Sequence, residues 1–161
     1  MLSVVIEIPK GSRNKYEYDV ESGVIKLDRF LYSSVVYPTD YGFIPDTWGQ
    51  DDDPLDAMVC VSEPTFPGCV IEVNPIALFR MRDEHGIDDK VLCVPVNDPA
   101  WNGLQKLDDL PDQLRAEIAH FFSVYKDLEQ KKDVDVDGWY SREDALQEID
   151  ESRERWRKRQ A

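Results

Sequence analysis

Residues 76–96 read IALFRMRDEHGIDDKVLCVPV, in which two apolar runs lie on either side of an acidic turn. The runs 76–81 and 90–96 are rich in the aliphatic and β-branched residues that strands favour, and Gly86 lies in the polar stretch between them. On its own this pattern is typical of two strands joined by a polar hairpin loop. We therefore predict two strands here and work outward from them.

Segments of the same kind precede this stretch. Short apolar runs occupy residues 3–9, 16–21, 23–27, 57–62 and 69–73, and Gly, Pro, Asp or Asn separates them. Strands at such regular spacing favour a small barrel or a sandwich. The aromatic-rich residues 30–49 lack this alternation, and we interpret them as a packed loop bounded by Pro and Gly.

The last third of the chain changes to helical periodicity. After Pro111 and Asp112, apolar residues recur at steps of three and four as far as Tyr125, which predicts a helix. Ser141 with Asp144 forms a capping box that predicts the start of another helix. The predicted stripe along one face of the second helix comprises Leu146, Ile149, Arg153 and Trp156. Its basic end, RERWRKRQ, suits a helix C-terminus.

Composition indicates a globular protein. The 161 residues are 42% apolar, enough for one core, so we expect a single domain over residues 1–161 that is mainly β with α, a barrel first and helices packed outside. The net charge of −14 argues against wrapping nucleic acid, which requires clustered cations. An anionic substrate remains compatible if metal ions reverse the field inside one cleft.

The cysteines and the N-terminus indicate the compartment. Cys60, Cys69 and Cys93 are odd in number, lack C-x-x-C spacing and lie in apolar runs, so we expect buried, reduced thiols in a cytoplasmic protein. The first residues, MLSVVIEIPK, contain neither a basic flank nor a long apolar stretch, so we expect no signal peptide and no membrane partner.

Four aspartates form an acidic hook at residues 51–56, DDDPLD, immediately before the apolar run AMVCV. Clustered carboxylates repel one another unless cations or solvent neutralise them. Oxygen donors of this kind suit Mg²⁺ or Mn²⁺ better than zinc. A second acidic turn with Asp83 and Asp88, and the strand residues Glu7 and Glu17, could converge on the same site. Taken singly, each group also fits an ordinary solvated surface.

Cations accompany aromatic residues elsewhere in the chain. Lys15, Arg29, Lys90 and Lys126 lie near tyrosines whose hydroxyl groups could donate to phosphate oxygens. A surface charge is the simpler interpretation of any one of them. His85 and His120 are too few to build a histidine-based triad, and no phosphate loop, G-x-S-x-G or H-E-x-x-H motif occurs.

A rival hypothesis is a calcium-binding module. Asp133, Asp135, Asp137 and Gly138, followed by Asp144, resemble an EF-hand loop. The apolar Val134 and Val136 between the aspartates alternate with them as in a strand, which favours a short strand instead. A nucleic-acid-binding OB fold is a third hypothesis, and the charge disfavours it.

Several ordered blocks together resemble the soluble family I inorganic pyrophosphatases of the bacterial type. They are VVIEIPKGSRNKYEYD, LDRFLYSSVVYPTDYGFIPDT, the hook D-x-D-P-L-D, FRMRDEHGIDDKVLCVP and IAHFFSVYKDLE, and they cover nearly the whole chain. The resemblance implies a five-stranded, OB-like β-barrel with helices outside and a homohexamer. It also implies hydrolysis of inorganic diphosphate to two orthophosphates by metal-activated water, with no covalent intermediate.

The resemblance also implies residue roles. The tightest metal site would comprise Asp51, Asp56 and Asp88, with Asp56 bridging a second ion, Asp83 and Glu17 holding further ions, and Glu7 acting through water. The implied diphosphate ligands are Lys15, Arg29, Tyr41, Lys90, Tyr125 and Lys126, while Tyr37 lines the cleft. Asp53 would accept the proton, with Asp88 as the alternative base. The implied cofactor is Mg²⁺, several per site, with Mn²⁺ or Zn²⁺ as substitutes.

Two positions depart from the family pattern. Asp52 replaces a small residue, often Gly, in the middle of the hook, and we expect it to face solvent. Val124 replaces a common His before Tyr125. Neither belongs to the implied metal or phosphate set.

Overall fold

The structure is a computed structural model that describes residues 1–130 and 133–161. Its strands are β1 (Leu2–Ile8), β2 (Asn14–Asp19), β3 (Val24–Phe30), β4 (Asp40–Phe43), β5 (Asp56–Val59), β6 (Val70–Asp83), β7 (Gly86–Pro95) and β8 (Asp135–Tyr140). Its helices are α1 (Asp112–Val124), α2 (Arg142–Gln160) and the short 3₁₀ turn η1 (Leu107–Asp109).

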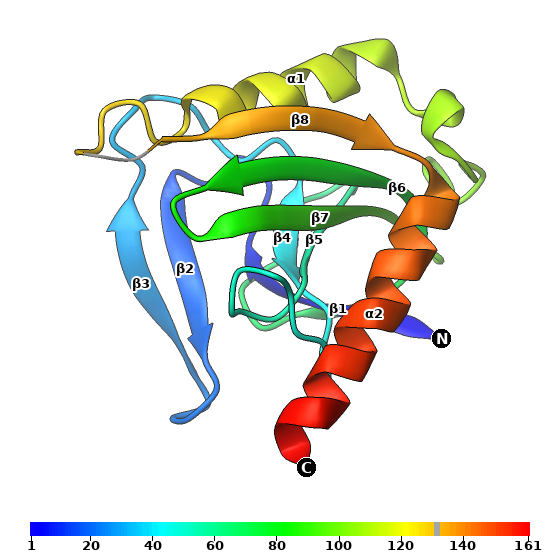
Figure 1. Ribbon diagram of the computed structural model, residues 1–161. Helices are drawn as coiled ribbons and strands as arrows, with labels where there is room; N and C mark the ends of the chain where they lie inside the picture. Colours follow the sequence, from blue (N-terminus) through cyan, green and yellow to red (C-terminus); the bar gives the residue numbers. More distant parts are fainter. Residues whose placement is uncertain (131–132) are drawn as a thin grey trace.

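Five strands close into a barrel. The main sheet has the order β1-β4-β5-β7-β6-β8, and an additional pairing of β1 with β6 closes the ring. All its pairings are antiparallel except that of β5 with β7. β8 extends the sheet beyond β6, and the β2–β3 hairpin projects from one side (Figure 1). The five-stranded, OB-like barrel with outer helices is confirmed.

The two strands predicted at 69–73 and 76–81 are one long strand, β6. We expected Asn74 and Pro75 to separate them. The structure instead keeps both in the pairing with β7, and the register shifts between Pro75 and Ala77. A β-bulge accommodates a proline because one residue leaves the ladder there. The length of β6 lets it pair with β1, β7 and β8 in turn.

β4 lies within residues 30–49, which we interpreted as a loop, so that interpretation is wrong at residues 40–43. β4 connects β1 to β5, and Gly42 makes the close approach to β1 feasible. A Cβ on Gly42 would lie 1.8 Å from the carbonyl oxygen of Val5. A glycine required by a neighbouring backbone does not produce the alternating pattern by which strands are recognised.

The barrel strands alternate their side chains between two apolar clusters. Met58 and Leu92 belong to the cluster that includes Ile118, Phe121 and Phe122 of α1. Their neighbours on the strands point the other way, into the cluster that includes Ala145 and Ile149 of α2. Figure 1 shows α1 over one side of the sheet and α2 crossing another. The barrel is therefore covered by a helix on two sides.

Both helices begin as predicted, but the buried stripe of α2 differs from the prediction. Ser141 caps α2 and accepts a hydrogen bond from the Asp144 backbone N–H. The buried residues of α2 are Ala145, Glu148, Ile149 and Ser152, whereas the predicted stripe residue Leu146 is 37% exposed. A pattern search for apolar residues cannot find a buried face that contains Glu and Ser.

The calcium-loop hypothesis is wrong. Residues 135–140 form strand β8, and Val134 and Val136 pack against the apolar core while the alternate aspartates face outward. Asp144 is engaged at the N-terminus of α2, where its side chain accepts from the Ser141 hydroxyl at 3.0 Å. The competing prediction of a short strand is confirmed.

The cysteines are free thiols, and Cys69 is half-buried where we expected it to be buried. Within residues 1–130 and 133–161, no helix has the length and apolar character needed to cross a membrane.

Candidate active site

A cavity of about 830 Å³ lies where the β2–β3 hairpin, the acidic hook, the β6–β7 turn and the end of α1 meet. Every residue for which we predicted a site role lines this cavity: Glu7, Lys15, Glu17, Arg29, Tyr37, Tyr41, Asp51, Asp53, Asp56, Asp83, Asp88, Lys90, Tyr125 and Lys126. His85 also lines it, whereas His120 is exposed on α1 and does not. Segments that are far apart in the sequence are thus brought together.

Three carboxylates meet in this cavity. Asp51, Asp56 and Asp88 each offer an oxygen within 4.8 Å of the others. The parallel pairing of β5 with β7 sets Asp56 opposite Lys90, two residues beyond Asp88. Asp51 comes instead from the hook, the loop between β4 and β5. Two of the three ligands therefore belong to paired strands and one to a loop.

The hook turns through a left-handed residue. Asp52 has φ +65° and is exposed, as we predicted for its side chain. Aspartate adopts this conformation more readily than most residues, although glycine does so without strain. Thr47 braces the base of the hook, since its hydroxyl accepts from the Leu55 N–H at 3.0 Å. The tight turn brings Asp51 back over the start of β5.

Lys90 lies among the carboxylates. Its Nζ donates to Tyr41 Oη at 2.6 Å, and it lies 3.1 Å from both Asp56 Oδ2 and Asp88 Oδ2. Tyr41 Oη in turn donates to Asp56 at 2.6 Å. The ammonium also lies 5.0 Å from the centre of the Phe122 ring. Lys90 thus contributes one buried positive charge to a group of three negative ones.

One lysine does not balance this charge. Burial, followed by the charges of Asp88 and Asp56, raises the pKa of Asp51 to about 8. Burial likewise raises the pKa of Asp88 to about 6 and that of Glu7 to about 7. Uncompensated oxygen donors at this spacing suit a hard divalent cation such as Mg²⁺ or Mn²⁺. The residues present therefore fit the metal that the sequence implied.

Asp53 stands apart from the three clustered carboxylates. It lies near the tip of the hook with its residue surface largely exposed, and its pKa is raised first by partial desolvation of the carboxyl group and then by the charges of Asp56 and Glu17. A carboxylate with a raised pKa is a stronger base than an ordinary one. The position and the chemistry of Asp53 suit proton acceptance at the mouth of the cluster.

Cations line another part of the cavity wall. The register of β2 with β3 sets Lys15 opposite Arg29. Asp28 lies between them, 3.1 Å from Lys15 and 2.7 Å from Arg29, and Arg29 also lies 2.9 Å from Glu129. We did not predict Asp28 or Glu129, because acidic partners from separate segments carry no local sequence signal. These partners fix the direction of the arginine.

Lys126 and the tyrosines complete this wall. Lys126 Nζ lies 3.8 Å from Asp83 and 5.4 Å from the centre of the Tyr125 ring. Tyr37 and Tyr125 are buried, and both rings pack on Phe121. The cavity therefore has an acidic floor and a cationic, hydroxyl-bearing wall, as expected for metal ions together with an anionic substrate.

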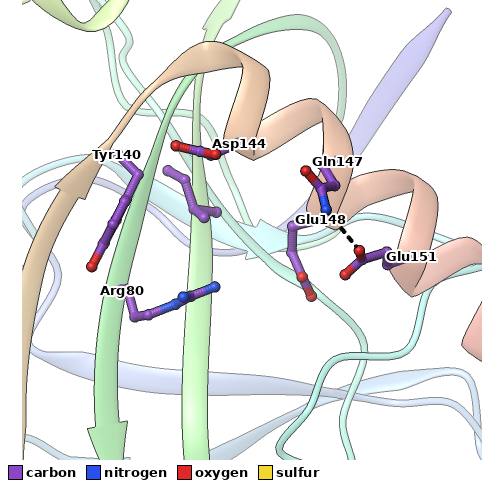
Figure 2. A pocket seen from close by; sticks show the side chains of 7 residues that line it. Arg80, Tyr140, Asp144, Gln147, Glu148 and Glu151 are labelled. Atoms are coloured by element: carbon purple, nitrogen blue, oxygen red, sulfur yellow. Dashed lines mark hydrogen bonds between the residues drawn. The ribbon is translucent and has the colours of Figure 1, made fainter.

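A smaller cavity of about 240 Å³ lies between β6, β8 and α2 (Figure 2). Its charged groups have partners. Arg80 donates to both oxygens of Asp89 at 2.7 and 2.8 Å, and Glu148 accepts from Ser152 and Arg155. Successive residues of a strand point to opposite faces, so Asp88 lines the large cavity while Asp89 points the other way and pairs with Arg80. This second cavity carries none of the three clustered carboxylates.

The chain is similar to the proteins of one known family over most of its length. Residues 4–157 match the family described as inorganic pyrophosphatase. The inorganic pyrophosphatase of Methanosarcina mazei is 57% identical over 153 residues, which are 95% of this chain and 90% of that protein. The inorganic pyrophosphatase of Streptomyces coelicolor is 54% identical over 154 residues, or 96% of this chain and 94% of that protein.

Solved structures of inorganic pyrophosphatases share the fold of this chain. The inorganic pyrophosphatase of Helicobacter pylori superposes with a TM-score of 0.94 at 39% identity, covering 96% of this chain and 92% of that one. That of Thermus thermophilus gives a TM-score of 0.93 at 46% identity, covering 96% and 90%. The chain therefore belongs to the inorganic pyrophosphatase family, whose reaction is the hydrolysis of inorganic diphosphate to two orthophosphates.

Proposed function

We propose that residues 1–161 act as a single Mg²⁺-dependent domain that hydrolyses diphosphate by direct attack of water, with no covalent intermediate. The observation that carries this proposal is the meeting of Asp51, Asp56 and Asp88, whose oxygens lie within 4.8 Å of one another on the floor of a cavity with a cationic wall. A set of hard oxygen donors next to phosphate-binding groups is the arrangement that metal-assisted phosphoryl transfer requires.

The carboxylates would hold the ions. Asp51, Asp56 and Asp88 are the proposed ligands of the tightest site, and Asp56 is the residue that reaches a second ion. Glu17 and Asp83 would assist further ions, and Glu7 would act through water. When bound, Mg²⁺ neutralises phosphate oxygens and lowers the pKa of a water toward neutrality, and Mn²⁺ or Zn²⁺ could replace it.

Asp53 is the proposed general base. It lies on the same hook as Asp51 yet outside the three clustered carboxylates, so its oxygens remain available to accept a proton from water. Its raised pKa brings its basicity closer to the operating pH. Asp88 is the alternative base, but its 3.1 Å contact with Lys90 and its place in the cluster favour a ligand role.

The cationic wall would bind the diphosphate. Arg29, Lys15 and Lys126 are proposed to neutralise phosphate oxygens, with Tyr125, Tyr41 and Lys90 completing the contacts and Tyr37 lining the cleft. The salt bridges of Lys15 and Arg29 to Asp28, and of Arg29 to Glu129, preorganise these two cations before substrate arrives. Preorganised charge of this kind lowers the barrier because it does not have to be reoriented during the reaction.

We also propose that the protein is a cytoplasmic homohexamer with no nucleic-acid or membrane partner. The three free cysteines support a reducing compartment, and the family resemblance supports the hexamer. The mass measured by light scattering after gel filtration tests the assembly, because six chains of 18.6 kDa differ clearly from one or two.

The test of the mechanism is phosphate release from diphosphate with Mg²⁺, for wild type, Asp53→Asn and the neighbouring Asp52→Asn. We expect Asp53→Asn to lower kcat by about 10²–10⁴-fold, because proton transfer contributes on that scale. Asp52→Asn removes the same charge one residue away and should retain wild-type turnover. Mn²⁺ binding followed by electron paramagnetic resonance should persist in Asp53→Asn. Retained turnover in Asp53→Asn would refute its role as base.

A further inference from the structure

The C-terminal half of α2 contacts Trp48, which lies three residues before the hook. The Trp48 backbone N–H donates to the Ser152 carbonyl oxygen at 2.9 Å. Arg155 Nε donates to the Trp48 carbonyl oxygen at 2.8 Å. The Arg159 guanidinium lies 3.8 Å from the centre of the Trp48 ring, within cation–π range. Both backbone polar groups of Trp48 and its side chain therefore contact one helix.

These helix residues belong to a buried polar network. Arg155 Nη2 donates to Ser152 Oγ at 2.9 Å and also to Glu148, and Ser152 Oγ donates to Glu148 at 3.1 Å. Glu148 is 4% exposed and Ser152 is fully buried. Steps of four, three and four residues from Glu148 to Arg159 follow one helical face.

Apolar residues would dock this helix at a lower desolvation cost than the buried Glu148 carboxylate and the half-buried Arg155 guanidinium do. The smaller cavity in Figure 2 borders the N-terminal half of α2, and Glu148 lies at its edge. Trp156 and Arg159, farther along the helix, line the large cavity instead. What distinguishes the polar face is its contact with Trp48, three residues before the hook.

Only Gly49 and Gln50 separate Trp48 from the proposed metal ligand Asp51. The Gly49 N–H donates to the Asp53 carbonyl oxygen at 2.6 Å. A Cβ on Gly49 would lie 2.9 Å from Asp51 Oδ1, so Gly49 and the Asp51 side chain are in close contact. Asp56 and Asp88 are fixed by strand pairing, but Asp51 is not. Mutual repulsion within the cluster favours outward movement of the loop-borne carboxylate.

We propose that Arg155, supported by Glu148 and Ser152 and assisted by Arg159, is a positioning residue that holds Asp51 and Asp53 over the carboxylates of β5 and β7. This inference rests on the proposed metal site. Without the contacts of Arg155 and Arg159 with Trp48, bound metal has to order the hook. A higher concentration of metal is then needed to fill the site. Once the site is full, the reacting groups occupy their usual places.

The test compares Arg155→Met with Arg142→Met. Arg142 belongs to the same helix and makes the same kind of bond, since its Nε donates to the Pro75 carbonyl oxygen at 3.0 Å, and neither residue lines the large cavity. Mn²⁺ binding without substrate is measured by electron paramagnetic resonance, and the Mg²⁺ dependence of phosphate release is measured separately. We expect Arg155→Met to raise the Mn²⁺ Kd and the half-saturating Mg²⁺ about tenfold, as the loss of a charged hydrogen bond implies.

The expected pattern separates positioning from general destabilisation. At saturating Mg²⁺, kcat of Arg155→Met should approach the wild-type value, and Arg142→Met should bind Mn²⁺ as wild type does. Equal Mn²⁺ affinity in Arg155→Met and wild type would overturn the proposal. An equal loss in both variants would do the same, because it would assign the effect to docking of α2 in general.

A second variant covers the case in which Arg155→Met does not fold. Arg159 is exposed, so Arg159→Gln leaves the buried network intact and should weaken Mn²⁺ binding in the same direction by a smaller factor. Unchanged Mn²⁺ binding in Arg159→Gln would then overturn the proposal. A wild-type protein without Mg²⁺-dependent phosphate release would refute the proposed function itself. Normal wild-type activity, together with wild-type Mn²⁺ binding in the variants, would refute only the positioning role of Arg155.

Discussion

Lys90 places a positive charge where water has little access. Its side chain is 2% exposed and lies 3.1 Å from both Asp56 and Asp88. Burial acts to lower the pKa of Lys90, but Asp88 and Asp56 outweigh it and hold the pKa well above the usual value. The ammonium group therefore stays charged and offsets part of the repulsion among the carboxylates when no divalent ion is bound.

Replacing Lys90 by methionine should destabilise the metal-free protein strongly. Breaking a buried ion pair leaves its partners uncompensated, which costs about 3–5 kcal/mol of unfolding free energy. Urea unfolding in the presence of a chelator measures the loss, and Mg²⁺ should restore part of it.

The matched control is Lys26→Met on β3. Its ammonium pairs with Asp19 at 2.8 Å, but the side chain is 62% exposed. A surface pair of this kind contributes about 0–1 kcal/mol. Similar losses in the two variants would contradict the role given to Lys90.

At the scale of elements, the sequence predicted strands and helices that carry a periodic pattern, and it missed those defined by a partner. Glu7 lies between the buried Ile6 and Ile8, and this alternation identified β1. The four residues of β4 have no such pattern and form a strand because β1 and β5 lie on either side. The buried face of α2 was missed because it includes Glu148 and Ser152, whose side chains are satisfied by Arg155 of the same helix.

Gly42→Ala should disrupt the pairing of β1 with β4. The added Cβ would lie 1.8 Å from the Val5 carbonyl oxygen, so backbone has to move on one side of the barrel. We expect a loss of about 3 kcal/mol or more in unfolding free energy, toward the severe end of single substitutions. Gly103→Ala is the control, since its Cβ would meet nothing within 4 Å. Thermal unfolding of both variants tests this prediction. Equal unfolding temperatures for Gly42→Ala and Gly103→Ala would show that the barrel tolerates the clash.

At the scale of the whole molecule, the fold concentrates acidic groups in a single cavity. Burial is the main cause that raises the pKa of Asp51 to about 8, of Glu7 to about 7 and of Asp88 to about 6. These groups come from the hook, β1 and β7, so their proximity is a property of the closed barrel. The folded state therefore binds protons that the unfolded chain releases at lower pH.

The stability of the metal-free protein should consequently fall as the pH rises. A raised carboxyl pKa contributes stability below the ordinary carboxyl range, and that contribution is lost as the pH passes through about 6 to 8. Urea midpoints measured with a chelator across this range test the direction. Excess Mg²⁺ should reverse the slope, because the ionised carboxylates then bind the ion.

Asp51→Asn provides the control for this pH dependence. It removes the group with the most strongly raised pKa in the cluster, so the metal-free slope should flatten. A metal-free wild type that gains stability between pH 6 and pH 8 would contradict the sign of these shifts.

The sequence by itself determined the inventory of chemistry: an acidic hook, cations with tyrosines, a barrel of short strands and two outer helices. These features follow from local patterns, because charge, turn residues and periodicity act over a few neighbouring positions. The tertiary structure alone decided which groups meet. Closure by β1 and β6, the contact of Lys90 with Asp56 and the contact of Arg155 with Trp48 all join residues distant along the chain. Such contacts depend on strand register and on how the helices pack, which no local pattern encodes.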